Sequence, residues 1–83
     1  MADWRWELFQ DDMLDGLPET GRAEAERLAH EIAVRESMVF LDGALFTGAG
    51  PGVRTESRGV LMLTYLTDVR GERIVVVQVN WFG

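Results

Sequence analysis

The sequence predicts an α+β domain: an N-terminal strand, one or two helices, and then an antiparallel β-meander with the helices packed on one face of the sheet. The main observation is a pair of apolar runs, residues 60–67 and 73–82, the second of them rich in valine, joined by the polar turn 68–72. Runs this apolar are typical of strands in a sheet with a covered face. A long amphipathic segment before them supplies the cover.

The N-terminal strand is predicted at residues 4–9, where large apolar residues alternate with charged ones. Trp4, Trp6 and Leu8 then share one face, because successive side chains of a strand point to opposite sides. Asp11 and Asp12 follow as a helix-start signal, since carboxylates cap free amides at the positive end of a helix. We expect a brief helical turn at 12–16.

The main helix is predicted from Pro18 to about Ser37, because proline suits a first helical turn and the segment is rich in alanine, glutamate and arginine. Its apolar stripe recurs at steps of three, four and seven residues. The predicted stripe consists of Leu17, Gly21, Ala25, Leu28, Ile32 and Val39.

A small hairpin with arms 38–41 and 44–47 is predicted around Asp42-Gly43, a dipeptide that suits a two-residue turn. The alternative is that the first arm is the frayed end of the helix. Residues 48–52 contain three glycines and a proline and indicate a connecting loop.

Residues 53–57 are expected to form a third strand, which turns near Arg58-Gly59 into the apolar strand 60–67. In the last strand, odd residues 75–81 are expected on one face and even residues 74–82 on the other.

Length and composition predict a single domain, residues 1–83, that is globular rather than disordered. The chain has no cysteine, which excludes disulfides and thiolate metal sites. No apolar run is long enough to span a bilayer, and no secretory signal is visible, so the expectation is a cytoplasmic protein without membrane contact.

Eight arginines, no lysine and fourteen acidic residues give a net charge of −6. Nucleic acid is therefore an unfavourable partner.

No metal or cofactor site is predicted. His30 is the sole histidine, and Glu26 one helical turn away would give only two ligands. The glycines of 48–52 lack the lysine and the strand–loop–helix context of a phosphate-binding loop.

The candidate site residues are Arg54 and Arg58, with Glu56 between them and Tyr65 on the next strand. Because strand side chains alternate, both arginines flank the carboxylate on one face. Such a pair can hold an anion or a phosphodiester. The alternative, which we favour, is an ordinary cross-strand ion pair on an outer surface.

The order of these elements resembles the RelE/ParE toxin superfamily. The resemblance rests on the strand at 4–9, the helical region with Leu17-Pro18, and the run from Val53-Arg54 through 59–65 to 74–79. It implies a helical pair on an antiparallel sheet and pairing with an antitoxin segment. The chain departs from the ribonucleases of that group, because it lacks lysine and ends in Trp81-Phe82-Gly83 where the group commonly ends in histidine-arginine. Tyr65 lies within a strand, so it does not match their late catalytic tyrosine.

The sequence therefore leads us to expect a small non-catalytic protein-binding module on a toxin-like scaffold. Its partner would be another protein or a second copy of itself, because the last strands are apolar on both faces. The alternative is a divergent ribonuclease-type toxin that acts on RNA through Arg54 and Arg58.

Overall fold

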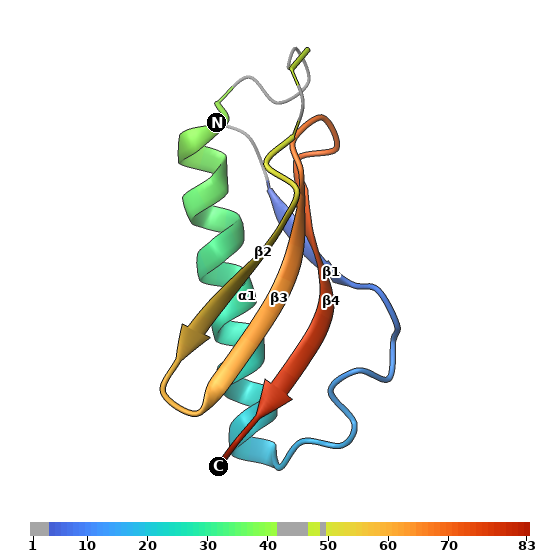
Figure 1. Ribbon diagram of the computed structural model, residues 1–83, viewed down its shortest axis with the longest axis vertical. Coiled ribbons are helices and arrows are strands. Elements are labelled where there is room, and N and C mark those ends of the chain that lie inside the picture. The colour runs from blue at the N-terminus through green and yellow to red at the C-terminus, as the bar shows by residue number, and fades with distance from the viewer. Residues whose placement is uncertain (1–3, 42–46, 49) are drawn as a thin grey trace.

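The computed structural model describes residues 4–41, 47–48 and 50–83, and it confirms the predicted α+β class. One long helix lies along one face of a four-stranded sheet (Figure 1). The elements are β1 (Arg5–Leu8), α1 (Glu19–Val39), β2 (Val53–Arg58), β3 (Leu61–Asp68) and β4 (Arg73–Trp81). No helix of the described residues is both long and apolar enough to cross a membrane.

The strand order across the sheet is β1-β4-β3-β2. Strands β2, β3 and β4 form the predicted antiparallel meander. The sheet is mixed, however, because β1 pairs with β4 in parallel, with Arg5 opposite Arg73 and Leu8 opposite Val76. Parallel neighbours cannot be joined by a tight turn. Here α1, β2 and β3 lie between them in the chain.

Residues 9–17 form bends and successive turns, so the brief helical turn predicted at 12–16 is a series of tight turns and not a helix. The turns are closed by i+3 hydrogen bonds from the amides of Met13, Asp15 and Leu17. Bonds of this kind do not reach the i+4 spacing that propagates an α-helix, and Gly16 lies inside the segment. The described part of the chain thus contains one helix rather than a pair.

Helix α1 begins after Pro18, as predicted, and carries Glu19 in its first turn. It continues to Val39, two residues beyond the predicted end, and the amide of Phe40 bonds the carbonyl of Glu36. The predicted stripe is correct from Gly21 to Ile32 and wrong at Val39, which is 64% exposed. Glu36 takes the buried position instead, because it follows Ile32 by four residues.

The first arm of the predicted hairpin, residues 38–41, does not form a strand. Met38 and Val39 belong to α1, so the alternative of a helix end at this point is correct. Residues 42–46, which include the proposed turn and most of the second arm, lie outside the described residues.

The two turns of the meander are where they were predicted. Gly59 has a φ of 59°, a left-handed conformation that suits glycine, and it connects β2 to β3. Between β3 and β4 the amide of Gly71 donates to the carboxylate of Asp68 at 3.0 Å. A Cβ at position 71 would collide with that carboxylate. The same turn places Glu72 at a φ of 54°.

A β-bulge in β4 changes the predicted faces of the last strand. Tyr65 pairs with Val76 and Thr64 pairs with Gln78, so Val77 has no opposite residue in β3. Before the bulge the even residues Ile74 and Val76 are buried. After it the odd residues Val79 and Trp81 pack against the core. The strict alternation predicted for 74–82 is therefore wrong across Val77.

The hydrophobic core lies between α1 and the inner face of the sheet. Partly buried residues around it include all three side chains predicted for the N-terminal strand face, namely Trp4, Trp6 and Leu8. The buried core comprises Leu14, Ala25, Leu28, Ala29, Ile32, Ala33, Leu61, Leu63, Tyr65, Ile74 and Val76.

Candidate functional site

Two surfaces of the molecule bear on function, and the first contains the predicted site residues of β2, with Tyr65 buried beneath them. Arg54, Glu56 and Arg58 all bond side chains of α1, so they share one side of β2, as the strand period predicts. We call this set the helix–β2 seam. It consists of Glu31, Arg35 and Glu36 from the helix and Arg54, Glu56 and Arg58 from the strand.

At one end of the seam Arg58 bonds Glu31 through both of its terminal nitrogens. Its Nη1 and Nη2 donate to the two carboxylate oxygens at 2.6 and 3.0 Å. This bidentate geometry is the strongest form of an arginine–carboxylate contact. The hydrogen bond raises the pKa of Arg58 and lowers that of Glu31. Two of the five donors of this arginine are therefore occupied by Glu31.

In the middle of the seam Arg35 links the helix to both β2 and β3. Its Nη1 lies 3.3 Å from Glu56, and its Nη2 donates to the hydroxyl of Tyr65 at 2.9 Å. Tyr65 is buried, so its hydroxyl needs such a partner. This tyrosine holds the sheet to the helix from inside the core.

At the other end Glu36 is buried, with 2% of its surface exposed. Its carboxylate pairs with Arg54 and accepts the hydroxyl of Thr67 at 3.1 Å. Arg54 also donates to the Thr67 hydroxyl at 3.1 Å, and its guanidinium lies 5.4 Å from the ring centroid of Tyr65. Its buried Nε has no hydrogen-bond partner among the described residues. The three polar groups form a closed triangle.

The seam carries three arginines and three glutamates, so its formal charge is zero. Each arginine points its donors at a carboxylate of the opposite element. The pairs run from helix to strand, rather than from strand to strand as the ion-pair interpretation of the sequence supposed. An anion that bound there would meet the three carboxylates of the seam as well as its arginines.

Sequence reasoning missed Glu36, Arg35 and Thr67. The signal for Glu36 was present, because it continues the four-residue spacing of Leu28 and Ile32. A carboxylate on an apolar stripe requires a buried cationic partner. Thr67 carried no such signal, since threonine is ordinary in a strand.

The second surface is the side of the sheet that α1 does not cover. We call it the outer sheet face. The alternation with buried residues continues at one end of the strands into the charged Asp68 and Arg73, so we define the face by the nine uncharged residues. These are Val53, Thr55 and Ser57 of β2, Met62, Thr64 and Leu66 of β3, and Val75, Gln78 and Asn80 of β4.

The nine residues form three rows across the strands. One row is apolar, with Val53 opposite Leu66 and Leu66 opposite Val75. The middle row contains Thr55, Thr64 and Gln78, and the hydroxyls of the two threonines lie 3.2 Å apart. Val53 is 61% exposed and Leu66 is 38% exposed, so the apolar row is open to water.

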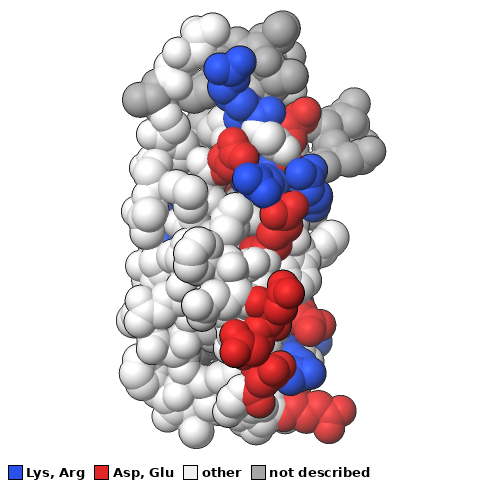
Figure 2. Space-filling view, turned by 90° about the vertical axis from the view of Figure 1, so that its right-hand side faces the viewer, with Lys and Arg blue, Asp and Glu red and all other residues white. Residues whose placement is uncertain are grey.

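The outer sheet face carries no charged residue, although 27% of the chain is charged. Figure 2 shows a broad surface without charged side chains beside a column of charged ones. At the β1 end of the sheet the face is bordered by four charged side chains that neutralise one another. Arg73 bonds Glu7 at 2.6 Å and Asp68 at 2.8 Å, and Arg5 bonds Glu7 at 2.9 Å.

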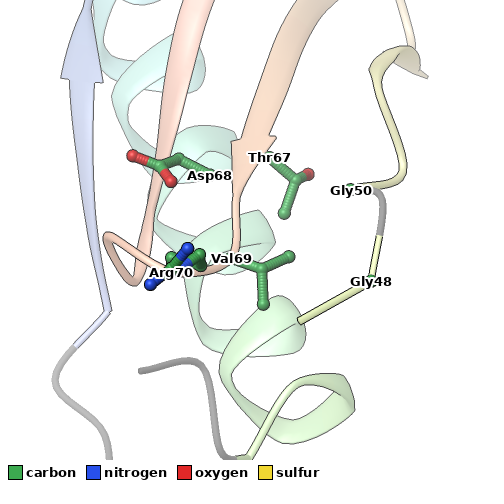
Figure 3. A pocket seen from close by; sticks show the side chains of 6 residues that line it. All are labelled: Gly48, Gly50, Thr67, Asp68, Val69 and Arg70. Carbon is green, nitrogen blue, oxygen red and sulfur yellow. The ribbon is translucent and has the colours of Figure 1, made fainter. Parts of the chain in front are cut away.

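A cavity of about 210 Å³ lies at one end of the sheet, beside the β3–β4 turn (Figure 3). Thr67 and Asp68 contribute to its lining from opposite sides of β3. Their polar atoms are already bonded to Glu36 and Arg73. The rest of the lining consists of Gly48, Gly50, Val69 and Arg70. The described lining therefore offers no set of converging free polar groups.

His30 lies on the exposed side of α1, away from the core. Among the described residues, no group of three or more histidine, aspartate or glutamate side chains is arranged to hold a metal ion.

Comparisons with protein-family models, curated proteins and solved structures gave no match to this chain.

Proposed function

We propose that this protein is a non-catalytic protein-binding module that contacts its partner through the outer sheet face. The observation that carries the proposal is a block of nine uncharged outward residues on three adjacent strands of a chain with net charge −6. The core of a protein–protein interface is depleted in charged residues. A sheet face that only had to meet water would have no reason to exclude them.

The helix–β2 seam supports a non-catalytic role. A catalytic arginine directs its donors at the substrate, whereas Arg54 and Arg58 direct theirs at Glu36 and Glu31. Tyr65 is buried under the same seam and bonded to Arg35. These residues support the fold that presents the outer sheet face.

We further propose that the scaffold is of the RelE/ParE toxin type, with a cytoplasmic protein partner. The order of strand, helix and three antiparallel strands supports this kinship. The helical pair of that group is represented here by the turns at 9–17 followed by the single described helix.

The proposal is tested by photo-crosslinking in the cells that make the protein. Thr55 on the outer sheet face is replaced by p-benzoyl-phenylalanine, and Glu26 on the exposed side of α1 is replaced in a matched control. We expect a discrete protein adduct from position 55 and none from position 26. No adduct at position 55, or the same adducts at both positions, would refute the proposal.

A further inference from the structure

We infer that the partner of the outer sheet face is a second copy of this chain, packed sheet to sheet about a twofold axis. This inference rests on the proposed function, because it names the occupant of the same surface. It is carried by three observations on charge, self-complementarity and the protected sheet edge.

The first observation is where the charge of the molecule lies. Two copies carry −6 each, so they can approach only through surfaces that do not add to the repulsion. The outer sheet face has no charge, and its border of two arginines and two carboxylates sums to zero. Outside this border and the neutral helix–β2 seam, the other described charges, seven carboxylates and three arginines, lie on α1 and in the turns and sum to −4.

A sheet-to-sheet dimer keeps those acidic regions apart. Its layers would be helix, sheet, sheet and helix, with successive layers separated by about 10 Å. The two helices would then lie roughly 30 Å apart, which is several times the Debye length of about 8 Å at physiological salt. Salt would screen most of the repulsion between the helices.

The second observation is that the polar side chains of the face are self-complementary. Thr55, Thr64, Gln78 and Asn80 can each donate and accept a hydrogen bond. A twofold axis brings a surface against its own copy, which amides and hydroxyls tolerate and charges of one sign do not. A basic or acidic partner would instead select a face of the opposite charge.

An axis parallel to the strands brings each row against the same row of the other copy. The apolar row of Val53, Leu66 and Val75 would then be buried against itself. This orientation removes the most apolar surface from water and is the one we adopt.

The third observation excludes the other simple dimer, in which two edge strands pair. The open edge of the sheet is β2, whose charged residues all turn inward and bond the helix. Inward-pointing charges are a known protection against edge pairing. The other edge, β1, has only four residues.

The size of the face sets the expected affinity. The three rows of the face, about 7 Å apart on three strands spaced about 5 Å, project on the order of 300 Å². Stable interfaces bury about 800 Å² of accessible surface per partner, so this one is at the small end. We therefore expect a dissociation constant on the order of 10–100 µM.

The first test is sedimentation of the purified chain from about 5 to 500 µM, a range that brackets this constant. The wild type should pass from monomer to dimer. Gln78→Arg and Thr55→Arg should raise the dissociation constant at least about tenfold, because each sets two like charges in a dry interface. Glu26→Gln changes the net charge by the same single unit on the exposed helix, so it is the matched control and should leave the dimer intact.

The second test uses the absence of cysteine. Leu66→Cys and Val34→Cys introduce single thiols at sites of similar exposure, 38% and 41%, on the outer sheet face and on the helix. We expect Leu66→Cys to form disulfide-linked dimers under mild oxidation much faster than Val34→Cys. Equal rates would overturn the proposed orientation.

A chain that stays monomeric at the highest concentration would overturn the self-association, and so would a dimer that both arginine variants leave unchanged. Circular dichroism of each variant must first show the wild-type fold. The proposed function fails separately, because a monomer that still gives a crosslink to a different protein at position 55 retains the binding face and loses only its assigned occupant.

Discussion

Glu36 of α1 and Arg54 of β2 form an ion pair in which the carboxylate is buried and the guanidinium is partly open to solvent. Thr67 bonds both partners, so the pair joins the helix to two strands at once. No other described acidic side chain is as deeply buried. The pair is therefore the polar counterpart of the hydrophobic core at this end of the helix.

Removing the charge of Glu36 should destabilise the fold. We expect Glu36→Gln to lower the free energy of unfolding by about 1–3 kcal/mol, because Arg54 would lose its counter-charge beside the core. Urea unfolding followed by circular dichroism measures the change. Glu24→Gln removes an exposed i,i+3 pair with Arg27 and should cost less than about 0.5 kcal/mol. Equal costs would contradict the importance of the buried pair.

Gly21 should tolerate no large side chain. A Cβ at this position would lie 3.1–3.3 Å from the indole of Trp81, so even alanine has to move the ring. We expect Gly21→Leu to lower the free energy of unfolding by about 1–3 kcal/mol through overpacking. Thr20→Ala, on the exposed side of the same turn, should instead raise it slightly, by about 0.5 kcal/mol at most. Urea unfolding compares the two, and an unchanged stability in Gly21→Leu would refute the contact.

Replacing Glu72 with glycine should stabilise the fold. Its φ of 54° is unfavourable for a residue with a Cβ and easy for glycine. We expect Glu72→Gly to raise the free energy of unfolding by about 0.5–1 kcal/mol. Gly59 has a φ of 59° with open space around it, so Gly59→Ala should lose about 1 kcal/mol by the reverse effect. A loss in Glu72→Gly, measured by thermal unfolding, would contradict this account of the turn.

Acid should weaken the β3–β4 turn. Hydrogen bonds from Arg73 and from the amide of Gly71 hold the pKa of Asp68 below its ordinary value of 3.8. As pH falls, the unfolded chain takes up this proton before the folded one, so the free energy of unfolding decreases toward acid. We expect a shallower decrease between about pH 5 and pH 3 in Asp68→Asn than in the wild type. Asp12→Asn in the exposed turn region is the matched control, and an unchanged slope in Asp68→Asn would refute the assignment.

The spacing of apolar residues and the residues typical of turns predict most of this fold from the sequence. The strands of the meander, the helix from Pro18 and the turn at Gly71 all follow from local patterns. The parallel pairing of β1 with β4 does not, because it joins residues far apart in the chain. The bulge at Val77 is also invisible, since valine fits either face of a strand.

The candidate site divides in the same way. The common face of Arg54 and Arg58 follows from alternation, but their partners Glu36 and Glu31 depend on how the helix lies across β2. The sequence alone does not show that the β2 part of the outer sheet face is uncharged. This follows only once the charged residues of β2 are assigned to the helix side. That assignment needs the tertiary structure, because Arg54, Glu56 and Arg58 are compatible with either side.

The position of β1 constrains the order in which this molecule can assemble. Its hydrogen-bonded neighbour in the described sheet is β4, the last strand to be synthesised. A nascent chain that has not yet reached residue 73 holds two tryptophans near its start with no strand to dock against. The pairing of β1 therefore waits for β4, and until then the apolar side chains of β1 lack their neighbour in the sheet.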